Sequence, residues 1–366
     1  MTRAKEFLND LAPGWEGQAD GLVLSMNLAR SSRGGAYLNL ELGDRTRRLA
    51  AKVWDNAEDL AETLAEGAVV RVRGRLESYR GAPQLVIREA RALSASEVDW
   101  RDYLKTAARP EAEMKEELFR LVSAMDDADY RRLTEAALNA PETAGFFMMP
   151  AAKNLHHAHL HGLLEHSLSV GRLAALVAVH YGQKLKAGLL VAGALLHDLG
   201  KVWEFSPPPR VDYTTLGRLQ GHAVLGARFL RSLAGTLPGF PGEKIDLLEH
   251  LLLSHHGEPE FGASVRPQLL EALVLHQLDN LDAKLEAVDA FLEEGTDGEG
   301  WSAYHRLFGG YFRRTPDLDP GPRPDLAPEP GPDLARAGKR LSPAGREAQK
   351  PTPTAPAAND QDGRLF

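Results

Sequence analysis

The stretch Gly193–Lys201, GALLHDLGK, sets an aspartate directly after a histidine at the end of an apolar segment. Aliphatic residues at helical spacing flank the pair and direct both side chains toward a core. A lone buried histidine or a capping aspartate would need no further explanation. Burying both together costs several kcal/mol, however, unless other groups compensate the charge. The stretch therefore predicts partner side chains elsewhere in the chain.

Suitable partners are concentrated in the same part of the sequence. Most of the 13 histidines lie between His156 and His256. Five histidines and two aspartates stand on successive predicted helices, each among aliphatic residues: His166, His197, Asp198, His222, His255, His256 and Asp279. Separate hydrogen-bonded core histidines would explain one or two of them. A shared metal ion is the simpler explanation for the whole set.

The ligand chemistry narrows the choice of metal. The chain has no cysteine, and imidazole with carboxylate suits Mn²⁺, Fe²⁺, Co²⁺, Ni²⁺ or Zn²⁺. An aspartate beside a histidine can bind one ion and bridge to a second, as in two-ion phosphoesterases. Lys201 follows Asp198 by three residues and can present a cation to a bound phosphate, with a solvated lysine as the equal alternative. One ion and two ions both fit the sequence.

Residues 17–93 show the period-two alternation of short β-strands. In AYLNLEL, Leu38, Leu40 and Leu42 share one face, and in VVRVRGRLE apolar residues alternate with arginines. The acidic segment NAEDLAETLAEG between them predicts a short helix closed by glycine. This order of elements predicts a small five-stranded OB barrel over 15–95.

From residue 100 the pattern changes to helical periodicity, which predicts an all-helical domain over 100–314. Residues 315–366 are rich in proline, glycine and alanine, and a disordered tail is expected there. The fold class is thus multi-domain, β then all-α. Seven helical segments are predicted: 111–125, 128–138, 161–180, 187–198, 219–233, 243–256 and 267–292.

Composition limits the function classes. Without cysteine there are no disulfides and no thiolate sites. The N-terminus lacks the apolar core of a signal peptide, and no apolar run reaches the ~20 residues of a membrane span. We therefore expect a cytoplasmic protein with no membrane partner. The net charge of −8 argues against a generally basic coat, so any nucleic-acid surface must be local.

Such a local surface is predicted on the barrel. Residues 21–91 contain 12 Lys and Arg and 9 Asp and Glu, so their formal net charge is +3. OB barrels bind single strands through basic grooves and aromatic platforms. Trp54, at a strand end, is expected to cover the barrel end or to pack on the helical domain. The predicted nucleic-acid contacts on the barrel are Tyr37, Arg71, Arg73, Arg75 and Arg80.

The order of histidines and aspartates resembles the HD metal-dependent phosphohydrolase superfamily. The segments PAAKNLHHAHLHGLLEHSLSV, GALLHDLGKVWEF, GRLQGHAVLG, LLLSHHGEPEFG and EALVLHQLDNLDAK, behind an OB fold, are more closely similar to YhaM-type 3′→5′ exoribonucleases. This resemblance covers roughly residues 15–312.

The resemblance implies roles for individual residues. It assigns four of them to a principal ion: His166, His197, Asp198 and Asp279. His222, with His255, His256 or both, would serve a second ion. Consecutive helical residues point about 100° apart, so two on one ion require a local distortion. The resemblance favours Mn²⁺ and places His157, within the family's HHA, at the substrate mouth; a solvated helix start is the alternative.

The function expected from these observations is hydrolysis of phosphodiesters at the 3′ end of single-stranded RNA, releasing 5′-nucleotides. Asp198 would hold metal, and Lys201 would stabilise developing charge. Direction and RNA preference rest on the resemblance alone; single-stranded DNA is a second substrate class. A nucleotidase acting on free nucleotides and a non-catalytic nucleic-acid adaptor are the alternatives. The complete set of ligand residues disfavours the adaptor.

The chain ends in DGRLF, whose Leu365-Phe366 loosely resembles the short peptides that dock on bacterial sliding clamps. An aspartate stands where such peptides begin with glutamine, which favours an incidental apolar end. A homo-oligomer is compatible with the sequence.

Overall fold

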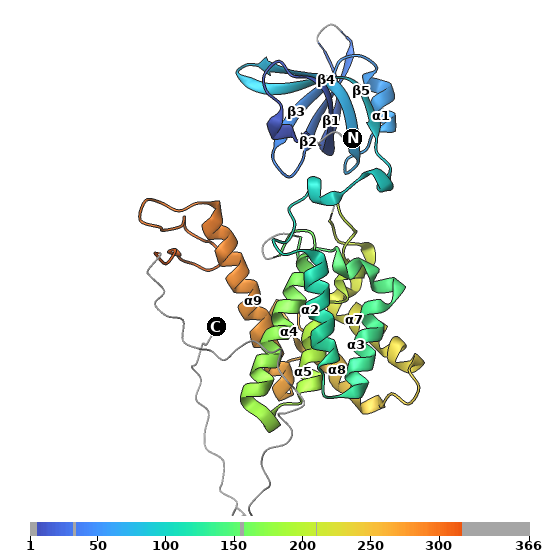
Figure 1. The fold of residues 1–366 in the computed structure, drawn as a ribbon, viewed down its shortest axis with the longest axis vertical. Coiled ribbons are helices and arrows are strands. Elements are labelled where there is room, and N and C mark those ends of the chain that lie inside the picture. The colour runs from blue at the N-terminus through green and yellow to red at the C-terminus, as the bar shows by residue number, and fades with distance from the viewer. Residues whose placement is uncertain (1–5, 32–33, 154–156, 210, 317–366) are drawn as a thin grey trace, which may run out of the picture.

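The computed structural model describes residues 6–31, 34–153, 157–209 and 211–316 (Figure 1). A five-stranded barrel is followed by a helical body, which confirms the predicted fold class. Nearly all of the expected tail, with Leu365-Phe366, lies outside the described residues.

The barrel is closed, with strand order β1-β2-β3-β5-β4. All neighbouring strands are antiparallel except β3 and β5, which run parallel. The long strand β1 pairs with β2 along one part of its length and with β4 along the other, and its pairing with β4 closes the barrel. The elements are β1 (Glu16–Arg30), β2 (Ala36–Gly43), β3 (Arg48–Val53), α1 (Ala57–Thr63), β4 (Val69–Tyr79) and β5 (Ala82–Ala92).

The predicted alternation of the strands decides which side chains fill the barrel. Leu38, Leu40 and Leu42 of β2 are buried in its core. On β4, Val70, Val72 and Leu76 point inward, while the arginines between them face outward. The outer surface of the barrel is therefore available for ligands.

The helical body surrounds one apolar helix, α5 (Ala187–Leu196). Its sequence AGLLVAGALL has no polar side chain, and α3, α4, α8 and α9 all pack against it. A helix that is apolar on every side is stable only when it is covered on every side. The other helices are α2 (Glu111–Ser123), α3 (Ala128–Asn139), α4 (Gly162–Tyr181), α6 (Lys201–Glu204), α7 (Thr215–Thr236), α8 (Gly242–Ser254) and α9 (Leu270–Glu294).

Gly200 allows α7 to approach the end of α5 closely. A Cβ atom at this position would lie 1.9 Å from the carbonyl oxygen of His222 and 2.7 Å from the amide nitrogen of Gly226. No side chain fits there. The glycine of the HDLGK motif thus brings α7 against Asp198.

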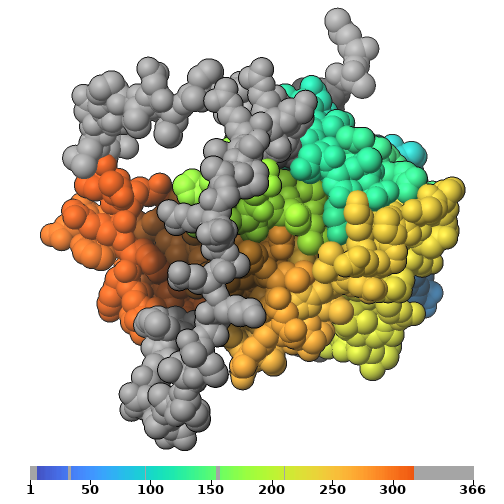
Figure 2. Space-filling view, turned by 90° about the horizontal axis from the view of Figure 1, so that it is seen from below, coloured from blue at the N-terminus to red at the C-terminus, as the bar shows by residue number. Residues whose placement is uncertain are grey.

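Several helix limits differ from the sequence prediction. The helix predicted over 187–198 ends at Leu196, so His197 and Asp198 stand in the turn that follows it. The helix predicted from 219 begins at Thr215 and is kinked at Gly221, where φ is +72°. The short α6 was not predicted. Beyond α9 the chain folds back through the bridges Trp301–Arg313 and His305–Gly310 and projects from one side of the body (Figure 2).

Helix α4 is buried within the body. The segment Gly162–Lys184, which contains it, is long and apolar enough to cross a membrane by length and composition, but 61% of its most apolar window is covered by the rest of the protein. It supplies part of the main core.

Asp127 caps α3 and ties it to α8. Its carboxylate accepts hydrogen bonds from the amides of Asp129 and Tyr130, and Nζ of Lys244 donates to it at 2.7 Å. Burial opposes its charge, but Lys244 and these amides together lower the pKa of the carboxyl below 3.8. We expect Asp127→Ala to reduce the free energy of unfolding by about 1–2 kcal/mol.

Asp127→Asn keeps the capping acceptor and removes only the charge, so its loss should be smaller. Because folding lowers the pKa, the difference between wild type and Asp127→Asn should be fully present above about pH 4. It should vanish as the pH falls through the folded-state pKa. Urea unfolding at pH 7 and pH 3 measures both effects. Equal stability of all three proteins at pH 7 would contradict this role.

Candidate metal centre

The His197-Asp198 pair emerges at the C-terminal end of α5, inside the helical body. The side chain of His197 is fully buried and that of Asp198 is 3% exposed. The central position of α5 therefore carries two ionisable groups into the core.

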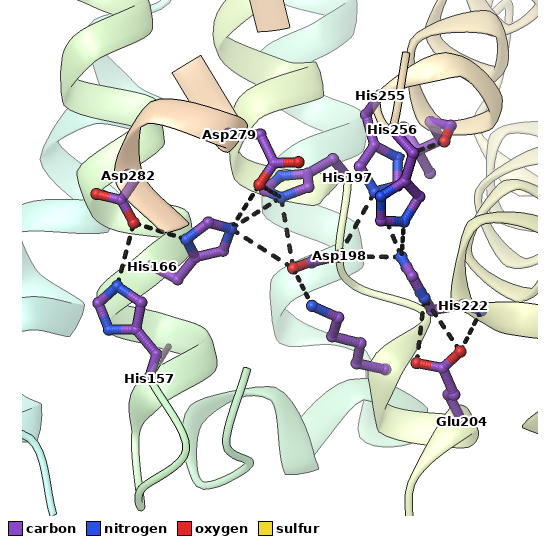
Figure 3. A network of polar contacts seen from close by, with 12 residues as sticks. His157, His166, His197, Asp198, Glu204, His222, His255, His256, Asp279 and Asp282 are labelled. Atoms are coloured by element: carbon purple, nitrogen blue, oxygen red, sulfur yellow. Dashed lines mark hydrogen bonds and ion pairs between the residues drawn. The ribbon is translucent and has the colours of Figure 1, made fainter. Parts of the chain in front are cut away.

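The first ligand group is formed by His166 on α4, His197, Asp198 and Asp279 on α9 (Figure 3). Nε2 of His166 lies 3.1 Å from Nε2 of His197 and 3.2 Å from Oδ1 of Asp279. Oδ2 of Asp198 lies 3.4 Å from Nε2 of His197. Four donor atoms, from α4, α9 and the turn after α5, thus converge on one point.

The second ligand group is formed by His222 on α7 with His255 and His256 (Figure 3). Nε2 of His222 lies 3.3 Å from Nε2 of His255 and 3.2 Å from Nε2 of His256. Helix α8 ends at Ser254, and His255 and His256 stand in the turn that follows it. Both rings reach the same point, beside Nε2 of His222.

Asp198 stands between the two groups and offers one oxygen to each. Oδ2 faces the first group, and Oδ1 lies 3.3 Å from Nε2 of His222. Oδ1 is buried and has no hydrogen-bond partner among the described residues. A buried carboxylate oxygen that has no hydrogen-bond partner and faces imidazole nitrogens could instead bind a cation. The side chains present therefore suit a divalent metal.

The outer ring nitrogens fix which atom each histidine turns inward. Nδ1 of His197 lies 2.9 Å from the Ala194 carbonyl, and Nδ1 of His255 lies 2.6 Å from that of Leu252. Carboxylates do the same elsewhere: Glu204 lies 3.1 Å from Nδ1 of His222, and Asp282 lies 2.7 Å from Nδ1 of His166. With Nδ1–H donating outward, Nε2 is left as the metal ligand, an arrangement common in metal sites.

Electrostatics favour the metal-binding protonation states of Asp198, His255 and His256. Burial would raise the pKa of Asp198, but Lys201 and His197 hold it well below its ordinary value. Burial lowers the pKa of His255, and burial together with His222 lowers that of His256 to about 4. Ionised carboxylates and neutral imidazoles are the forms that bind metal. His197 differs: burial opposes its charged form, but Asp198 and Asp279 raise its pKa to about 10, so an ion bound there would displace its proton.

Lys201 lies beside the centre, as the sequence predicts. Its Nζ is 2.5 Å from Oδ2 of Asp198, and its side chain is 10% exposed. Both residues line a cleft with a volume of 930 Å³. The remaining wall includes cationic, aromatic and amide side chains, among them Lys153, Tyr213, Phe261, Arg266, Asn280 and Lys284.

The structure places His157, expected at the substrate mouth, away from the residues that line the cleft. Its side chain is 5% exposed and lies behind His166, where it contacts Asp282 and Glu165 (Figure 3). A side chain enclosed in this way cannot line a substrate mouth. Its backbone has a φ of +47°, so the spacing rules of a helix start do not apply to it.

Two carboxylates of the centre escaped the sequence analysis. Glu204 orients His222, and Asp282 orients His166. Asp282 follows Asp279 by three residues on one helix, a spacing that places both on the same face and could have suggested it. Glu204 had no such signal, because the short α6 was not predicted.

On the barrel, aromatic and cationic side chains gather on one face. Trp54 lies 5.1 Å from Tyr37, centroid to centroid, and is 49% exposed, so it does not merely cover the barrel end. Nζ of Lys52 lies over both rings, 4.7 Å and 4.9 Å from their centroids, and Arg80 lies over Tyr79. We call Tyr37, Lys52, Trp54, Tyr79 and Arg80 the aromatic face.

Arg71, Arg73 and Arg75 of β4, which we call the arginine stripe, are predicted by the sequence to contact nucleic acid. Two of the three form ion pairs with acidic residues of the barrel. Nε of Arg71 lies 2.7 Å from Oδ1 of Asp20 in a two-pronged ion pair, and Arg75 pairs with Glu77. Arg73 is exposed. Of the predicted contacts, Tyr37 and Arg80 lie on the aromatic face, whereas Arg71 is held by an acid of the neighbouring strand.

Comparison with known proteins agrees with both halves of this geometry. The HD domain family matches residues 163–284, and the OB-fold nucleic acid binding domain family matches 20–93. A 3′-5′ exoribonuclease YhaM from Geobacillus sp. (strain WCH70) is 37% identical over 279 residues, which cover 76% of this chain and 85% of that protein. The YhaM of Bacillus subtilis (strain 168) is also 37% identical, over 76% and 88%.

Replacing Asp198 tests its position between the two ligand groups. We expect Asp198→Asn to weaken divalent metal binding more than about 100-fold, beyond the about 10–100-fold loss expected for the outer variant Glu204→Gln. His250→Ala, on α8 but outside both groups, should bind metal normally. Metal content after gel filtration and calorimetric titration measure this, with circular dichroism as the check on folding. A folded Asp198→Asn protein with wild-type metal content would contradict the assignment.

Proposed function

The chain belongs to the YhaM family of 3′→5′ exoribonucleases, and we propose that it shortens single-stranded RNA at a two-ion centre built around Asp198. The observation that carries this proposal is the divided carboxylate. One oxygen of Asp198 faces His197, and the other, which has no hydrogen-bond partner among the described residues, faces His222. A single ion would leave one histidine group without a role.

The residues divide the work of the centre between them. His166, His197 and Asp279 would hold one ion with Asp198, and the three histidines of the second group would hold the other. Bound ions of this kind activate the attacking water and neutralise charge on the phosphodiester. Lys201, buried beside Asp198, would place its ammonium near the phosphate oxygens and stabilise the charge that develops there. We propose Mn²⁺ by family likeness.

The aromatic face of the barrel would hold the strand upstream of the cleft. Bases stack on exposed aromatic rings whatever their sequence, and Lys52 between two rings supplies a charge for the backbone. Outer surfaces around strands two and three are the usual binding face of OB folds. This favours a polymer substrate over a free nucleotide, for which such a platform would have no use.

The proposed substrate and direction follow the named relatives. Removal of one nucleotide at a time from the 3′ end leaves 5′-nucleotides as products. Stacking and phosphate contacts hardly sense the 2′-hydroxyl, so DNA should be a slower substrate and not an excluded one. By the same likeness we place the enzyme in the cytoplasm.

A time course on end-labelled oligomers tests this function. With Mn²⁺, 5′-labelled RNA should shorten in a ladder, while 3′-labelled RNA should release labelled mononucleotide from the first time point. The same assay with Co²⁺, Ni²⁺, Fe²⁺ and Zn²⁺, and with DNA, ranks metals and substrates. Release from the 5′ end, or hydrolysis restricted to free nucleotides, would contradict the proposal.

The aromatic face can be tested separately from the chemistry. Trp54→Ala should weaken binding of long single strands by about 1–3 kcal/mol. Lys52→Ala should flatten the slope of log affinity against log salt by about 0.7. Turnover at saturating concentrations of short oligomers should be nearly unchanged, because the chemical centre is untouched.

Arg71→Ala is the matched control, since its guanidinium is already paired with Asp20. Its salt slope should equal that of wild type. If Arg71→Ala flattens the slope and Lys52→Ala does not, the strand runs over the arginine stripe and not over the aromatic face.

A further inference from the structure

A second histidine cluster lies behind His166, away from the cleft. His157, His159 and Glu165 form it, and we call it the rear cluster. Oε2 of Glu165 lies 2.9 Å from Nε2 of His159 and 3.3 Å from Nδ1 of His157. One ligand atom from each residue lies within 4.8 Å of the others. The two imidazole side chains are only 8% and 5% exposed.

The backbone holds the rear cluster in place. His157 and His161 both have φ in the left-handed region, at +47° and +66°, which is uncommon for residues that carry a Cβ atom. The carbonyl of His157 accepts a hydrogen bond from the amide of Ala151. The carbonyl of Leu160 accepts one from the amide of Ala107, in the segment that precedes α2. Glu165 belongs to the first turn of α4. The surrounding structure thus fixes both rings against one carboxylate.

Asp282 links the rear cluster to the catalytic centre. Its Oδ2 lies 2.7 Å from Nδ1 of His166 and 3.1 Å from Nε2 of His157 (Figure 3). Ser169 donates to the other oxygen. His157 therefore has the same relation to Asp282 as the ligand His166: one ring nitrogen faces the carboxylate, and the other faces a group of possible metal ligands.

We propose that Nδ1 of His157, Nε2 of His159 and Oε2 of Glu165 bind a further divalent cation, best suited by Zn²⁺. Two imidazoles and one carboxylate are a common zinc ligand set, and water would complete the coordination. Donation from Nε2–H of His157 to Asp282 leaves Nδ1 with a lone pair for the ion, and a carboxylate at this place is the usual support of a ligand histidine.

Without a cation, the same contacts require protons on both nitrogens of His157. Burial opposes the charged form, but hydrogen bonds to Asp282 and Glu165 raise the pKa of His157 to about 9. A doubly protonated ring and a metal-bound ring thus satisfy the same two carboxylates. The two states differ in one measurable property, the number of ions that the protein binds.

The proposed cation has a positioning role. It would hold His157, which with Ser169 holds Asp282, and Asp282 sets the ring of His166. The rear cluster also lies near Leu160 in sequence, whose backbone forms hydrogen bonds with Lys105 and Ala107 in the segment that precedes α2. The ion would therefore hold the loop that leads into α4 against the first turn of that helix, without contacting the substrate.

The test counts metal ions in the full-length protein. Metal-free protein is loaded with Zn²⁺, passed through gel filtration and analysed by elemental mass spectrometry. We expect His159→Ala to bind one ion fewer per chain than wild type, and Glu165→Gln to do the same. His180→Ala, on the exposed part of α4, should bind as many ions as wild type. Equal ion content in wild type, His159→Ala and Glu165→Gln would overturn the proposal.

Asp198→Asn separates this inference from the proposed function. It should lose ions at the centre but retain the ion of the rear cluster, seen as a Zn²⁺-dependent rise in melting temperature that the double variant Asp198→Asn/His159→Ala lacks. If Asp198→Asn binds as much metal as wild type, the centre is wrongly assigned. If no Zn²⁺-dependent rise survives in Asp198→Asn, the rear cluster is not a metal site.

Discussion

The structure of the helical body depends on a buried carboxylate that must be compensated from two sides. Asp198 is held in the core by α5, and removing its charge from water costs several kcal/mol. His166, His197 and the ammonium of Lys201 gather at one of its oxygens, and His222 and His255 gather at the other. Asp279 of α9 lies 3.2 Å from His166. Helices α4, α7, α8 and α9 each carry or lead into residues of this arrangement. The packing of these helices therefore also sets the positions of the groups that would bind metal.

This constraint explains features that packing alone leaves unexplained. Gly200 lets α7 come close enough for His222 to reach Asp198, and just beyond α8 the rings of His255 and His256 both lie beside His222. Glu204 and Asp282 then fix ring orientations from outside. Under the proposed function, the barrel and the body would have separate tasks: the aromatic face would hold the strand, and the cleft at Lys201 would receive its end.

The sequence predicts the parts of this molecule that follow from periodicity. Alternation in β2 and β4 identifies the barrel, and aliphatic spacing around His197 and Asp198 identifies a buried pair. Periodicity does not report which polar groups meet. The buried place of His157 depends on a left-handed backbone, and the pairing of Arg71 with Asp20 depends on the register of β1 and β4. The exposed stacking of Trp54 on Tyr37 depends on neighbouring strands in the same way.

The central claim is that two ions share the carboxylate of Asp198. Electron paramagnetic resonance during titration of Mn²⁺ into metal-free protein tests it most directly, in a His159→Ala background that removes the rear cluster. Two ions about 3.5–4 Å apart on one carboxylate should be coupled, so the six-line signal of isolated Mn²⁺ should give way to an exchange-coupled spectrum as the second equivalent binds. A six-line signal that only grows through the second equivalent, or binding that stops at one ion, would contradict the account.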